Sequence, residues 1–414
     1  MEIEITAMTS GPYGLGHHEG KAVLISGVAP GDVIEAIVAA EHRDYTIARA
    51  ARVLHASPVR RAPPCPFLPR CGGCDWQHLD YAAQVRIKAE LIAAEFKRAL
   101  GIELPLEGLV EASPAEFAYR SRIRLQVGRD GAIGYHAAGS NDLVAIDRCM
   151  VAISESVPAN VASQLGRRCR SIEVVADNGR EVLIVDLAKT ATSAEIAIAR
   201  RMLESGRGIK GIILRCGGDR ITLGDCIITL EPEAGCAIEA EADCFNQVNR
   251  EQNRKLVAAV IEMAQPREGL AILDLFCGAG NFSVPLARRG ARVTAVDADS
   301  LAIAAAARNA HRMGLRDTQF IAMKASETAR FLARAHYHPD VVTLDPPRHG
   351  AAELIAPVAR LKPASIIYVS CDCATLVRDL QALHSFGYEI AQVRAFDFFP
   401  NTHHAEVAVR ALLT

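Results

Sequence analysis

Hydrophobic positions follow a repeating strand and helix pattern from about residue 241 onward. The apolar runs that read as strands lie at 272–276, 292–296, 341–344 and 366–370. Each run is followed by a stretch whose apolar residues have helical spacing, and this alternation is typical of a parallel sheet with helices on both faces. The pattern predicts a doubly wound, Rossmann-like α/β domain over residues 241–414.

Residues 1–55 carry a different pattern of short, evenly spaced strands. Strand-like runs occur at 21–25 and 33–38, and Gly and Pro mark the turns between them. This pattern predicts a small β-barrel of the OB type, a fold that often binds single-stranded nucleic acid. A plain dimerisation or packing module is the alternative.

The central region, residues 56–240, opens with a Pro-rich boundary. Helical spacing of apolar residues predicts a helix at 80–100 and another at 193–203, and strand patterns fill much of the remainder. We therefore expect a central mixed α+β domain.

Composition narrows the class of protein. The chain has 414 residues, of which 50% are hydrophobic and 23% charged, as in globular proteins with two or three domains. No apolar run approaches the roughly 18 residues of a membrane helix, and residues 1–6 alternate without the regions of a signal peptide. A cytoplasmic protein is expected. The net charge of −2 does not by itself support a nucleic-acid partner.

A glycine loop follows the first strand of the C-terminal pattern. Gly278 and Gly280 allow a close approach of the backbone to a ligand, and the helix predicted at 282–289 adds amide donors. The next strand ends at Asp297, whose carboxylate suits ribose hydroxyls. A dinucleotide site would have a third glycine where Ser283 stands. The loop therefore favours S-adenosylmethionine (SAM), a cofactor without a pyrophosphate.

A cysteine, Cys371, ends the strand predicted at 366–370, just before a predicted helix. This placement predicts a lowered pKa and a reactive thiolate. Methylation of carbon 5 of a pyrimidine needs such a nucleophile, because thiolate addition at carbon 6 activates carbon 5. A base must then remove the carbon-5 proton, and Glu406 is the candidate. The alternative for Cys371 is a small buried hydrophobic residue.

Twelve cysteines in a chain expected to be cytosolic point to metal, cluster or catalytic thiols rather than to disulfides. Four of them, Cys65, Cys71, Cys74 and the distant Cys149, offer a set of four thiolates. Such a set suits zinc and a [4Fe–4S] cluster equally.

The C-terminal half resembles the RNA 5-methyluridine methyltransferase family. The matching segments are Phe245-x-Gln247-x-Asn249, Asp274-Leu275-Phe276-Cys277-Gly278-x-Gly280-Asn281-Phe282, Asp345-Pro346-Pro347-Arg348-x-Gly350, Ser370-Cys371-x-x-Ala374-Thr375-x-x-Arg378-Asp379 and His404-x-Glu406. A subset of the family also carries a Cys-Gly-Gly-Cys segment like residues 71–74, and an N-terminal TRAM domain that resembles residues 1–55.

The resemblance implies a SAM-dependent RNA uracil-C5 methyltransferase with Cys371 as nucleophile and Glu406 as base. The SAM contacts that it implies are Gln247, Phe276, Asn281, Asp297 and Asp345. It also implies a [4Fe–4S] cluster on Cys65, Cys71, Cys74 and Cys149, with zinc as the less favoured alternative and with a structural or RNA-docking role.

The barrel and the cysteine segment together favour 23S ribosomal RNA as substrate, because bacterial transfer-RNA members of the family usually lack both. A transfer-RNA substrate stays open. A cytosine-C5 methyltransferase is disfavoured, because Arg348 stands where RNA enzymes of that kind usually carry a second cysteine. A non-catalytic iron–sulfur RNA-binding factor is the alternative of a different class. The sequence does not identify the modified uridine or the oligomeric state.

The sequence departs from the family pattern after the nucleophile. Asp372 and Cys373 stand where the family usually has Asn-Pro, so the role of the second thiol is an open question. A separate candidate for RNA contact is the alternating stretch 119–125, in which Arg120, Arg122 and Arg124 share one strand face beside Tyr119. Phosphate contact and base stacking are expected there, with a solvated strand face as the alternative.

Overall fold

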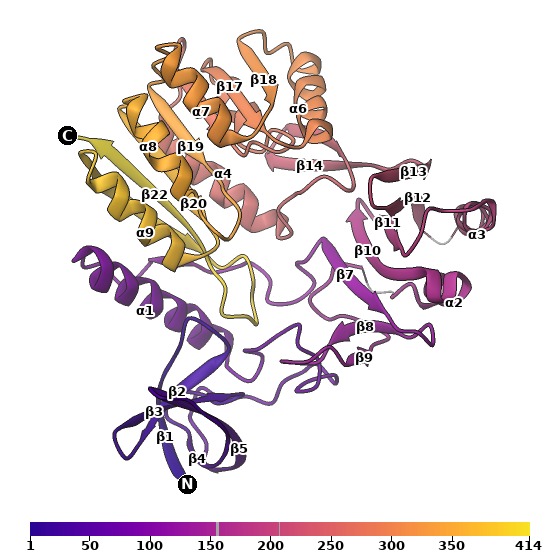
Figure 1. The fold of residues 1–414 in the computed structure, drawn as a ribbon, viewed down its shortest axis with the longest axis vertical. Helices are drawn as coiled ribbons and strands as arrows, with labels where there is room; N and C mark the ends of the chain where they lie inside the picture. Colours follow the sequence, from indigo (N-terminus) through magenta and orange to yellow (C-terminus); the bar gives the residue numbers. More distant parts are fainter. Residues whose placement is uncertain (155–156, 207) are drawn as a thin grey trace.

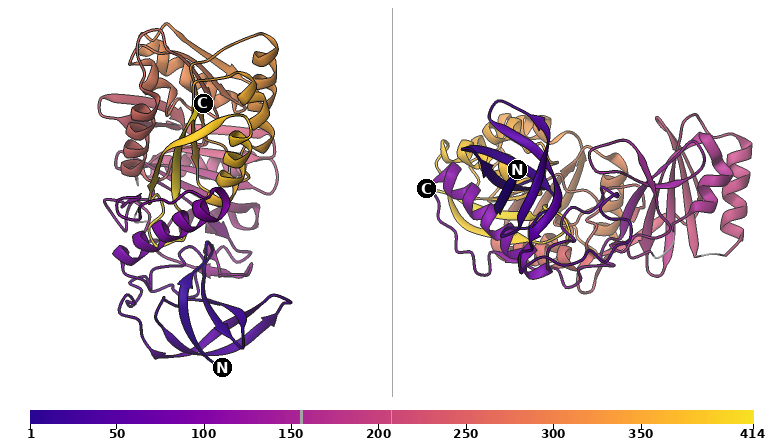
Figure 2. Two further views of the ribbon diagram at one scale, coloured as in Figure 1. Left: turned by 90° about the vertical axis from the view of Figure 1, so that its left-hand side faces the viewer. Right: turned by 90° about the horizontal axis from the view of Figure 1, so that it is seen from below.

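The computed structural model describes residues 1–154, 157–206 and 208–414. A small barrel at the N-terminus, a central sheet and a larger C-terminal sheet with helices follow one another along the chain (Figures 1 and 2). The C-terminal and central parts lie side by side, and the barrel extends away from them. In the part of the chain that the structure describes, no helix is long and apolar enough to span a membrane.

The N-terminal barrel has five strands and closes in the order β1-β2-β3-β5-β4. The strands are β1 (Glu2–Met8), β2 (Tyr13–His18), β3 (Lys21–Ser26), β4 (Val33–Glu41) and β5 (Tyr45–His55). Alternate residues such as Ile3, Ile5, Val23 and Ile25 point into its core, as the period of a strand requires. The predicted barrel is confirmed.

The central sheet has seven strands in the order β13-β12-β11-β10-β7-β8-β9. They are β7 (Arg122–Val127), β8 (Ile133–His136), β9 (Leu143–Ala145), β10 (Cys169–Asp177), β11 (Arg180–Leu187), β12 (Ile209–Cys216) and β13 (Asp219–Gly224). Helix α2 (Ala159–Leu165), the 3-10 turn η1 (Gly166–Arg168) and helix α3 (Ser193–Glu204) complete this part. Thr192 and Glu195 form a capping box at the start of α3, so the helix predicted at 193–203 is confirmed.

Helix α1 (Tyr81–Leu100) begins where the side chain of Asp80 accepts the N–H of Ala83, and it ends at Gly101 in the left-handed conformation. It packs on α9, and its Phe96 is fully buried in the C-terminal core. The two-residue strand β6 (Val110–Glu111) pairs with β21 at the edge of the C-terminal sheet. The chain therefore contributes to the C-terminal core before it enters the central sheet.

The C-terminal sheet has eight strands in the order β18-β17-β16-β19-β20-β22-β21-β6. Its strands after β6 are β16 (Ala271–Leu275), β17 (Arg292–Asp297), β18 (Thr318–Ala322), β19 (Val341–Leu344), β20 (Ser365–Ser370), β21 (Tyr388–Phe396) and β22 (Glu406–Leu413). The helices are α4 (Arg250–Ala264), α5 (Ser283–Ala287), α6 (Ser300–Arg312), α7 (Ala325–Arg334), α8 (Ala352–Arg360) and α9 (Cys373–His384). A hairpin of β14 (Ile227–Glu233) and β15 (Cys236–Glu241) packs against α4 and α6.

Helices cover both faces of this sheet, as the strand–helix alternation predicted. Within β16, Ile272 belongs to the core with α4 and α5, whereas Leu273 belongs to the opposite core with α7, α8 and α9. Strand side chains alternate between the two cores, which explains the continuous apolar runs in the sequence.

One strand departs from the predicted parallel sheet. Strands β18, β17, β16, β19 and β20 are parallel, but β22 runs antiparallel to β20, with Ser370 opposite Val407. The prediction of an all-parallel sheet was therefore wrong for β22. Because β22 is reversed, its first residue, Glu406, lies at the same edge as the last residue of β20. This reversal is what brings the end of β20 and the start of β22 together.

Candidate active site

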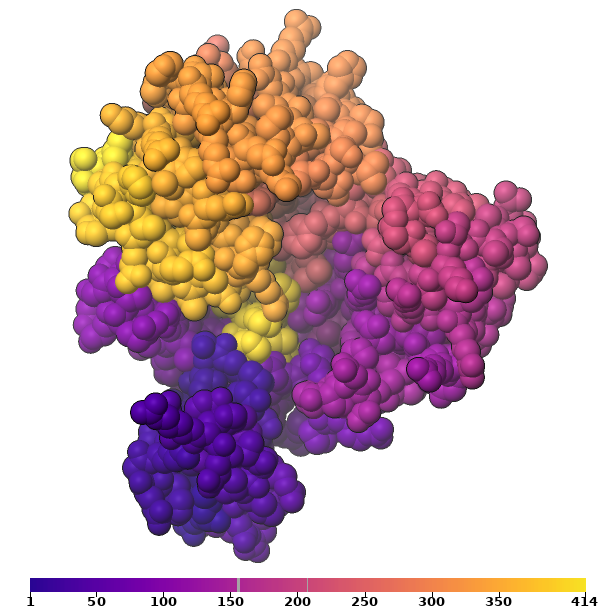
Figure 3. Space-filling model, in the orientation of Figure 1, coloured from indigo at the N-terminus to yellow at the C-terminus, as the bar shows by residue number. Residues whose placement is uncertain are grey.

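One cavity of about 800 Å³ lies at the carboxyl edge of the parallel strands. All seven residues predicted as nucleophile, base or SAM contacts line it: Gln247, Phe276, Asn281, Asp297, Asp345, Cys371 and Glu406. Arg120, which precedes the first central strand, also lines it. In the space-filling view, a hollow separates the C-terminal part from the central part (Figure 3). The cavity is therefore built by segments far apart in the sequence.

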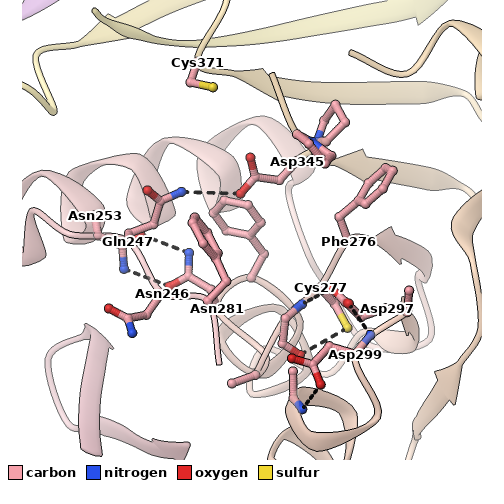
Figure 4. A pocket seen from close by; sticks show the side chains of 18 of the residues that line it. Asn246, Gln247, Asn253, Phe276, Cys277, Asn281, Asp297, Asp299, Asp345 and Cys371 are labelled. Atoms are coloured by element: carbon pink, nitrogen blue, oxygen red, sulfur yellow. Dashed lines mark hydrogen bonds between the residues drawn. The ribbon is translucent and has the colours of Figure 1, made fainter. Parts of the chain in front are cut away.

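The glycine loop is shaped by left-handed backbone conformations. Phe276, Gly278 and Gly280 have φ values of 66°, 54° and 100°. A Cβ atom at Gly280 would lie 2.7 Å from Cγ2 of Val284, so a side chain there would clash. The N–H of Gly278 donates to Oδ2 of Asp297 at 2.9 Å (Figure 4). The loop thus holds the carboxylate of Asp297 at the rim of the cavity.

Asp274, the second-last residue of β16, stabilises the glycine loop through its side-chain hydrogen bonds. It is fully buried, is not among the residues that line the cavity, and accepts hydrogen bonds from the hydroxyls of Ser283 and, at 2.5 Å, Thr343. Burial raises the pKa of Asp274 to about 6. Ser283, which replaces the third glycine of a dinucleotide site, therefore has a structural partner.

The amide of Asn281 is held by a residue that the sequence did not reveal. Asn281 and Asn253 of α4 exchange two side-chain hydrogen bonds, of 2.8 and 3.0 Å. Asn253 is buried and also lines the cavity. The one sequence signal for Asn253 is that a polar amide stands on the buried face of the amphipathic helix α4.

Asp345 follows β19 and points into the cavity opposite the glycine loop (Figure 4). The side-chain amide of Gln247 donates to its Oδ2 at 3.5 Å. Burial, followed by the negative charge of Asp274, raises the pKa of Asp345 to about 7, although the bond from Gln247 acts in the opposite direction. Asp345 can therefore accept or donate a hydrogen bond near neutral pH.

The loop 345–350 that carries Asp345 is fixed by helix α9. Buried Asp379 accepts the N–H of Ala351 at 2.7 Å and the hydroxyl of Tyr368 at 2.6 Å, and Arg378 pairs with it at 2.7 Å. A Cβ atom at Gly350 would lie 2.6 Å from the guanidinium of Arg378. These contacts give the Arg-Asp pair of the sequence motif a structural role.

Cys371 is partly buried at the end of β20. Burial and, next in size, the carboxyl of Glu406 raise the pKa of this thiol to about 11, and the positive charge of Arg348 lowers it. The expectation of a lowered pKa was therefore wrong for the free protein. Helix α9 begins two residues later, and the side chain of Asp372 accepts the N–H of Thr375 at its N-terminus. One backbone N–H of the first helical turn, that of Thr375, is thus already hydrogen-bonded to the helix cap.

Glu406 is buried, with 3% of its surface exposed. Burial and the charge of Asp345 raise its pKa well above the usual range, and Arg348 again acts in the opposite direction. In the free protein, burial therefore favours the protonated forms of both Cys371 and Glu406.

Arg348 also lines the cavity, although its place in a sequence motif alone indicated no role for it. Its guanidinium donates to Nε2 of His404 at 3.2 Å. Burial, followed by the charges of His403 and Arg348, lowers the pKa of His404 to about 4, so its ring is neutral and can accept this bond. Arg348 is the cation that favours the anionic forms of both Cys371 and Glu406.

The second thiol, Cys373, is the first residue of α9 and packs against the C-terminal core. Burial raises its pKa to about 12, and it is not among the residues that line the cavity. The departure from the family pattern after Cys371 therefore leaves a single cysteine of this loop facing the cavity.

The four cysteines of the predicted cluster are partly buried in loops beside the central sheet. Burial raises the pKa of Cys74 to about 12, and the nearby Cys149, Cys71 and Cys65 act in the same direction. Over residues 1–154, 157–206 and 208–414, no group of three or more His, Cys, Asp or Glu side chains has the geometry of a metal site.

Two arginines of the row at 119–125, Arg122 and Arg124, form ion pairs within the protein and do not present a free face for RNA phosphates. Arg122 donates to the carbonyl of Cys244 at 2.9 Å and pairs with Glu173 at 3.4 Å. Arg124 pairs with Asp186 at 2.9 Å. Acidic residues of β10 and β11 lie on the same face of the sheet, so these two arginines pair within the protein.

Tyr119 is buried as well, with 5% of its surface exposed, and its hydroxyl donates to the carbonyl of Pro400 at 3.2 Å. The prediction that it stacks on a base was wrong. Of the residues predicted for RNA contact, Arg120 alone lines the cavity.

A family model described as tRNA (uracil-5-)-methyltransferase matches residues 199–413. The chain belongs to this family. It is 33% identical to a 23S rRNA (uracil(1939)-C(5))-methyltransferase of Pectobacterium atrosepticum over 98% of this chain and 92% of that protein. It is 32% identical to the enzyme of the same name from Pseudomonas fluorescens, with the same coverage.

A solved structure of the family has the same fold. The tRNA (uracil-54, C5)-methyltransferase of Pyrococcus abyssi, in complex with S-adenosyl-L-homocysteine, superposes with a TM-score of 0.76 at 25% identity, and 100% of each chain is covered. Family membership confirms the enzyme class that the resemblance implied, a SAM-dependent RNA (uracil-C5) methyltransferase.

Proposed function

We propose that this protein methylates carbon 5 of a uridine in 23S ribosomal RNA, with Cys371 as nucleophile and Glu406 as base. The observation that carries the proposal is the meeting of the end of β20 and the start of β22 beside one cavity. A thiol and a carboxyl at that edge are the two groups that the chemistry of carbon 5 needs. The ribosomal substrate is supported by relatives of that name that match along nearly the whole chain.

The reaction follows from the two side chains. The thiolate of Cys371 attacks carbon 6 of uracil, and the electrons of the carbon 5–carbon 6 double bond move toward the oxygen on carbon 4. Carbon 5 then takes the methyl group of SAM, and S-adenosylhomocysteine leaves. Glu406 removes the carbon-5 proton, the double bond re-forms, and the bond between carbon 6 and sulfur breaks to release the thiolate.

These steps use the thiolate of Cys371 and the carboxylate of Glu406, whereas burial favours the protonated form of each group. Arg348 opposes that effect, because its charge stabilises the anionic forms of both groups. Asp345 lines the same cavity as Glu406, and burial raises its pKa to about 7. We assign it a hydrogen bond to the polar edge of uracil or to the SAM amino group.

The volume of about 800 Å³ and the polar side chains that line the cavity support a site for SAM beside a base. We assign Asp297 to the ribose hydroxyls, Phe276 to the adenine face, and Gln247 and Asn281 to the polar groups of the cofactor. The target uridine must leave its stack to enter the cavity, and exposed Phe245 at the rim is placed to meet it.

We also propose a [4Fe–4S] cluster on Cys65, Cys71, Cys74 and Cys149, with zinc as the alternative. Four thiols form a ligand set that suits such a cluster or zinc, and the three neighbouring cysteines raise the pKa of Cys74, an effect that a bound cation would offset. A Cβ atom at Gly72 would lie 3.0 Å from backbone atoms of residues 136 and 138, so the close turn requires glycine. Its proposed role is structural, since the reaction above needs no electron transfer.

We propose three domains, at residues 1–55, 56–240 and 241–414, although helix α1 and strand β6 of the second range pack into the C-terminal core. We also propose that the barrel is a TRAM-type RNA-binding unit and that the protein is cytoplasmic. A transfer-RNA substrate is the second candidate, supported by the solved relative, which acts on transfer RNA.

Nucleoside mass spectrometry tests the proposal. In cells that lack this protein, 5-methyluridine should disappear from large ribosomal RNA and return with the wild-type gene but not with Cys371→Ala. Loss from transfer RNA instead would overturn the substrate, and unchanged 5-methyluridine in both fractions would overturn the function.

A further inference from the structure

The segment that follows Cys74 contacts the loop that leads to Glu406. The backbone N–H groups of Asp75 and Trp76 both donate to the carbonyl of Asn401, at 3.1 and 2.9 Å. The carboxylate of Asp75 accepts a hydrogen bond from Nδ1 of His403, and both side chains are about four-fifths buried. Residues 328 positions apart in the sequence thus form a paired contact near the active site.

Asn401 is the most constrained residue of this loop. It is fully buried and left-handed, with a φ of 68°. Its N–H donates to Gln84 at 2.7 Å, its side-chain amide donates to the carbonyl of Glu116 at 3.0 Å, and its side-chain oxygen accepts from Arg61 at 3.2 Å. A non-glycine residue in this conformation persists when its surroundings hold it.

The other end of the loop is anchored by a buried ion pair. Nζ of Lys88 lies 2.6 Å from Oδ1 of Asp397, and neither side chain is exposed. The same ammonium donates to the carbonyl of Phe399 at 3.1 Å. The loop 397–404 is therefore held at both ends by residues from the first third of the chain.

From His403 the contacts continue to the reacting groups. The rings of His403 and His404 have centroids 3.9 Å apart. His404 in turn accepts the hydrogen bond from Arg348, and Glu406 is two residues further along the chain. A displacement of His403 would therefore move the neighbours of both the base and its cation.

We propose that Asp75 and His403 are positioning residues, which hold the loop 401–404 so that Glu406 is placed to remove the carbon-5 proton. The cysteine segment thereby acts on catalysis through direct contact, in addition to any part in folding or RNA binding. The inference rests on the proposed function, because it assigns the contact to the base-dependent step of that reaction.

The test compares three variants in single turnover. Asp75→Ala removes the acceptor for His403, whereas Asp75→Asn keeps an oxygen that can accept the same bond. Asp130→Ala is the control, because it likewise removes a carboxylate that accepts a hydrogen bond, here from the N–H of Ala132 at 3.1 Å in an exposed turn of the central sheet. RNA containing 5-fluorouridine measures formation of the covalent adduct alone, because fluorine at carbon 5 cannot be removed as a proton.

We expect Asp75→Ala to slow release of methylated, ordinary RNA about tenfold to a hundredfold, and to accumulate the covalent adduct on that RNA. Its adduct formation with 5-fluorouridine RNA and its affinity for SAM should change much less, and Asp75→Asn should restore release. Equal slowing of both steps, or equal behaviour of Asp130→Ala, would overturn the inference. If the wild-type protein forms no adduct with 5-fluorouridine RNA, the proposed function itself fails.

Discussion

Replacing Glu406 with glutamine should separate the two halves of the reaction. The change keeps the size of the side chain but removes the carboxyl that raises the pKa of Cys371. Attack of the thiolate and transfer of the methyl group need no base at carbon 5, so both should proceed. Removal of the carbon-5 proton should fail, and the methylated RNA should stay bonded to Cys371.

The magnitudes follow from the structure. With a pKa of about 11, about one Cys371 thiol in a thousand is ionised at pH 8 in the free protein. Adduct formation should therefore rise about tenfold per pH unit between pH 7 and 10, because the thiolate is the reactive form. Loss of the carboxyl should leave this rate unchanged or faster, since the group that raises the pKa of Cys371 is gone. Turnover should fall about 10²- to 10⁴-fold, the usual contribution of a general base.

The assay follows both steps on the same protein. Denaturing gels quantify the covalent adduct with ordinary and with 5-fluorouridine RNA, and release of tritium from carbon 5 measures proton removal. Wild-type protein should show a stable adduct with the fluorinated RNA alone, whereas Glu406→Gln should show one with both. Retention of normal tritium release by Glu406→Gln, or loss of the adduct with 5-fluorouridine RNA, would refute the assignment of Glu406 as the base.

Three further changes have distinct expected results. Arg348→Gln removes the cation that lowers the pKa of Cys371. The rise of adduct formation with pH should therefore move to higher pH, and the rate of adduct formation at pH 8 should fall roughly tenfold. An unchanged pH profile would contradict this role of Arg348. Asn253→Ala removes the hydrogen-bond partner of Asn281. The Kd for SAM, measured by calorimetry, should therefore rise, while adduct formation at saturating SAM stays near normal. An unaltered Kd would show that the amide pair does not shape the SAM site. Lys88→Met leaves Asp397 buried and unpaired, which should cost about 3–5 kcal/mol in the unfolding transition of the C-terminal part, measured with urea; a loss below about 1 kcal/mol would mean that the pair is replaceable.

Much of the site could be predicted because strand ends are visible in the sequence. Cys371 and Asp345 each follow an apolar run, and the carboxyl ends of parallel strands meet at one edge. Glu406 could be predicted only through its motif, because its position depends on the reversal of β22, which hydrophobic alternation does not encode.

Other features depend on tertiary burial and could not be predicted. The direction of the pKa shift of Cys371 is set by burial and by a carboxyl 35 positions away, which outweigh proximity to a helix start. The pairing of Arg122 and Arg124 depends on acidic residues of neighbouring strands, so an alternating row of arginines could not be distinguished from an RNA-binding face. Asn253 carries no sequence signal beyond a polar residue on a buried helix face.

The most direct test of the central claim is to map the covalent bond between the protein and RNA. A complex formed with 5-fluorouridine RNA and SAM, digested with trypsin and nuclease, would be sequenced by mass spectrometry. We predict a methylated 5-fluorouridine adduct on Cys371, with Cys373, two residues away and packed into the core, unmodified. An adduct on another cysteine, or complete methylation by Cys371→Ala, would contradict the account.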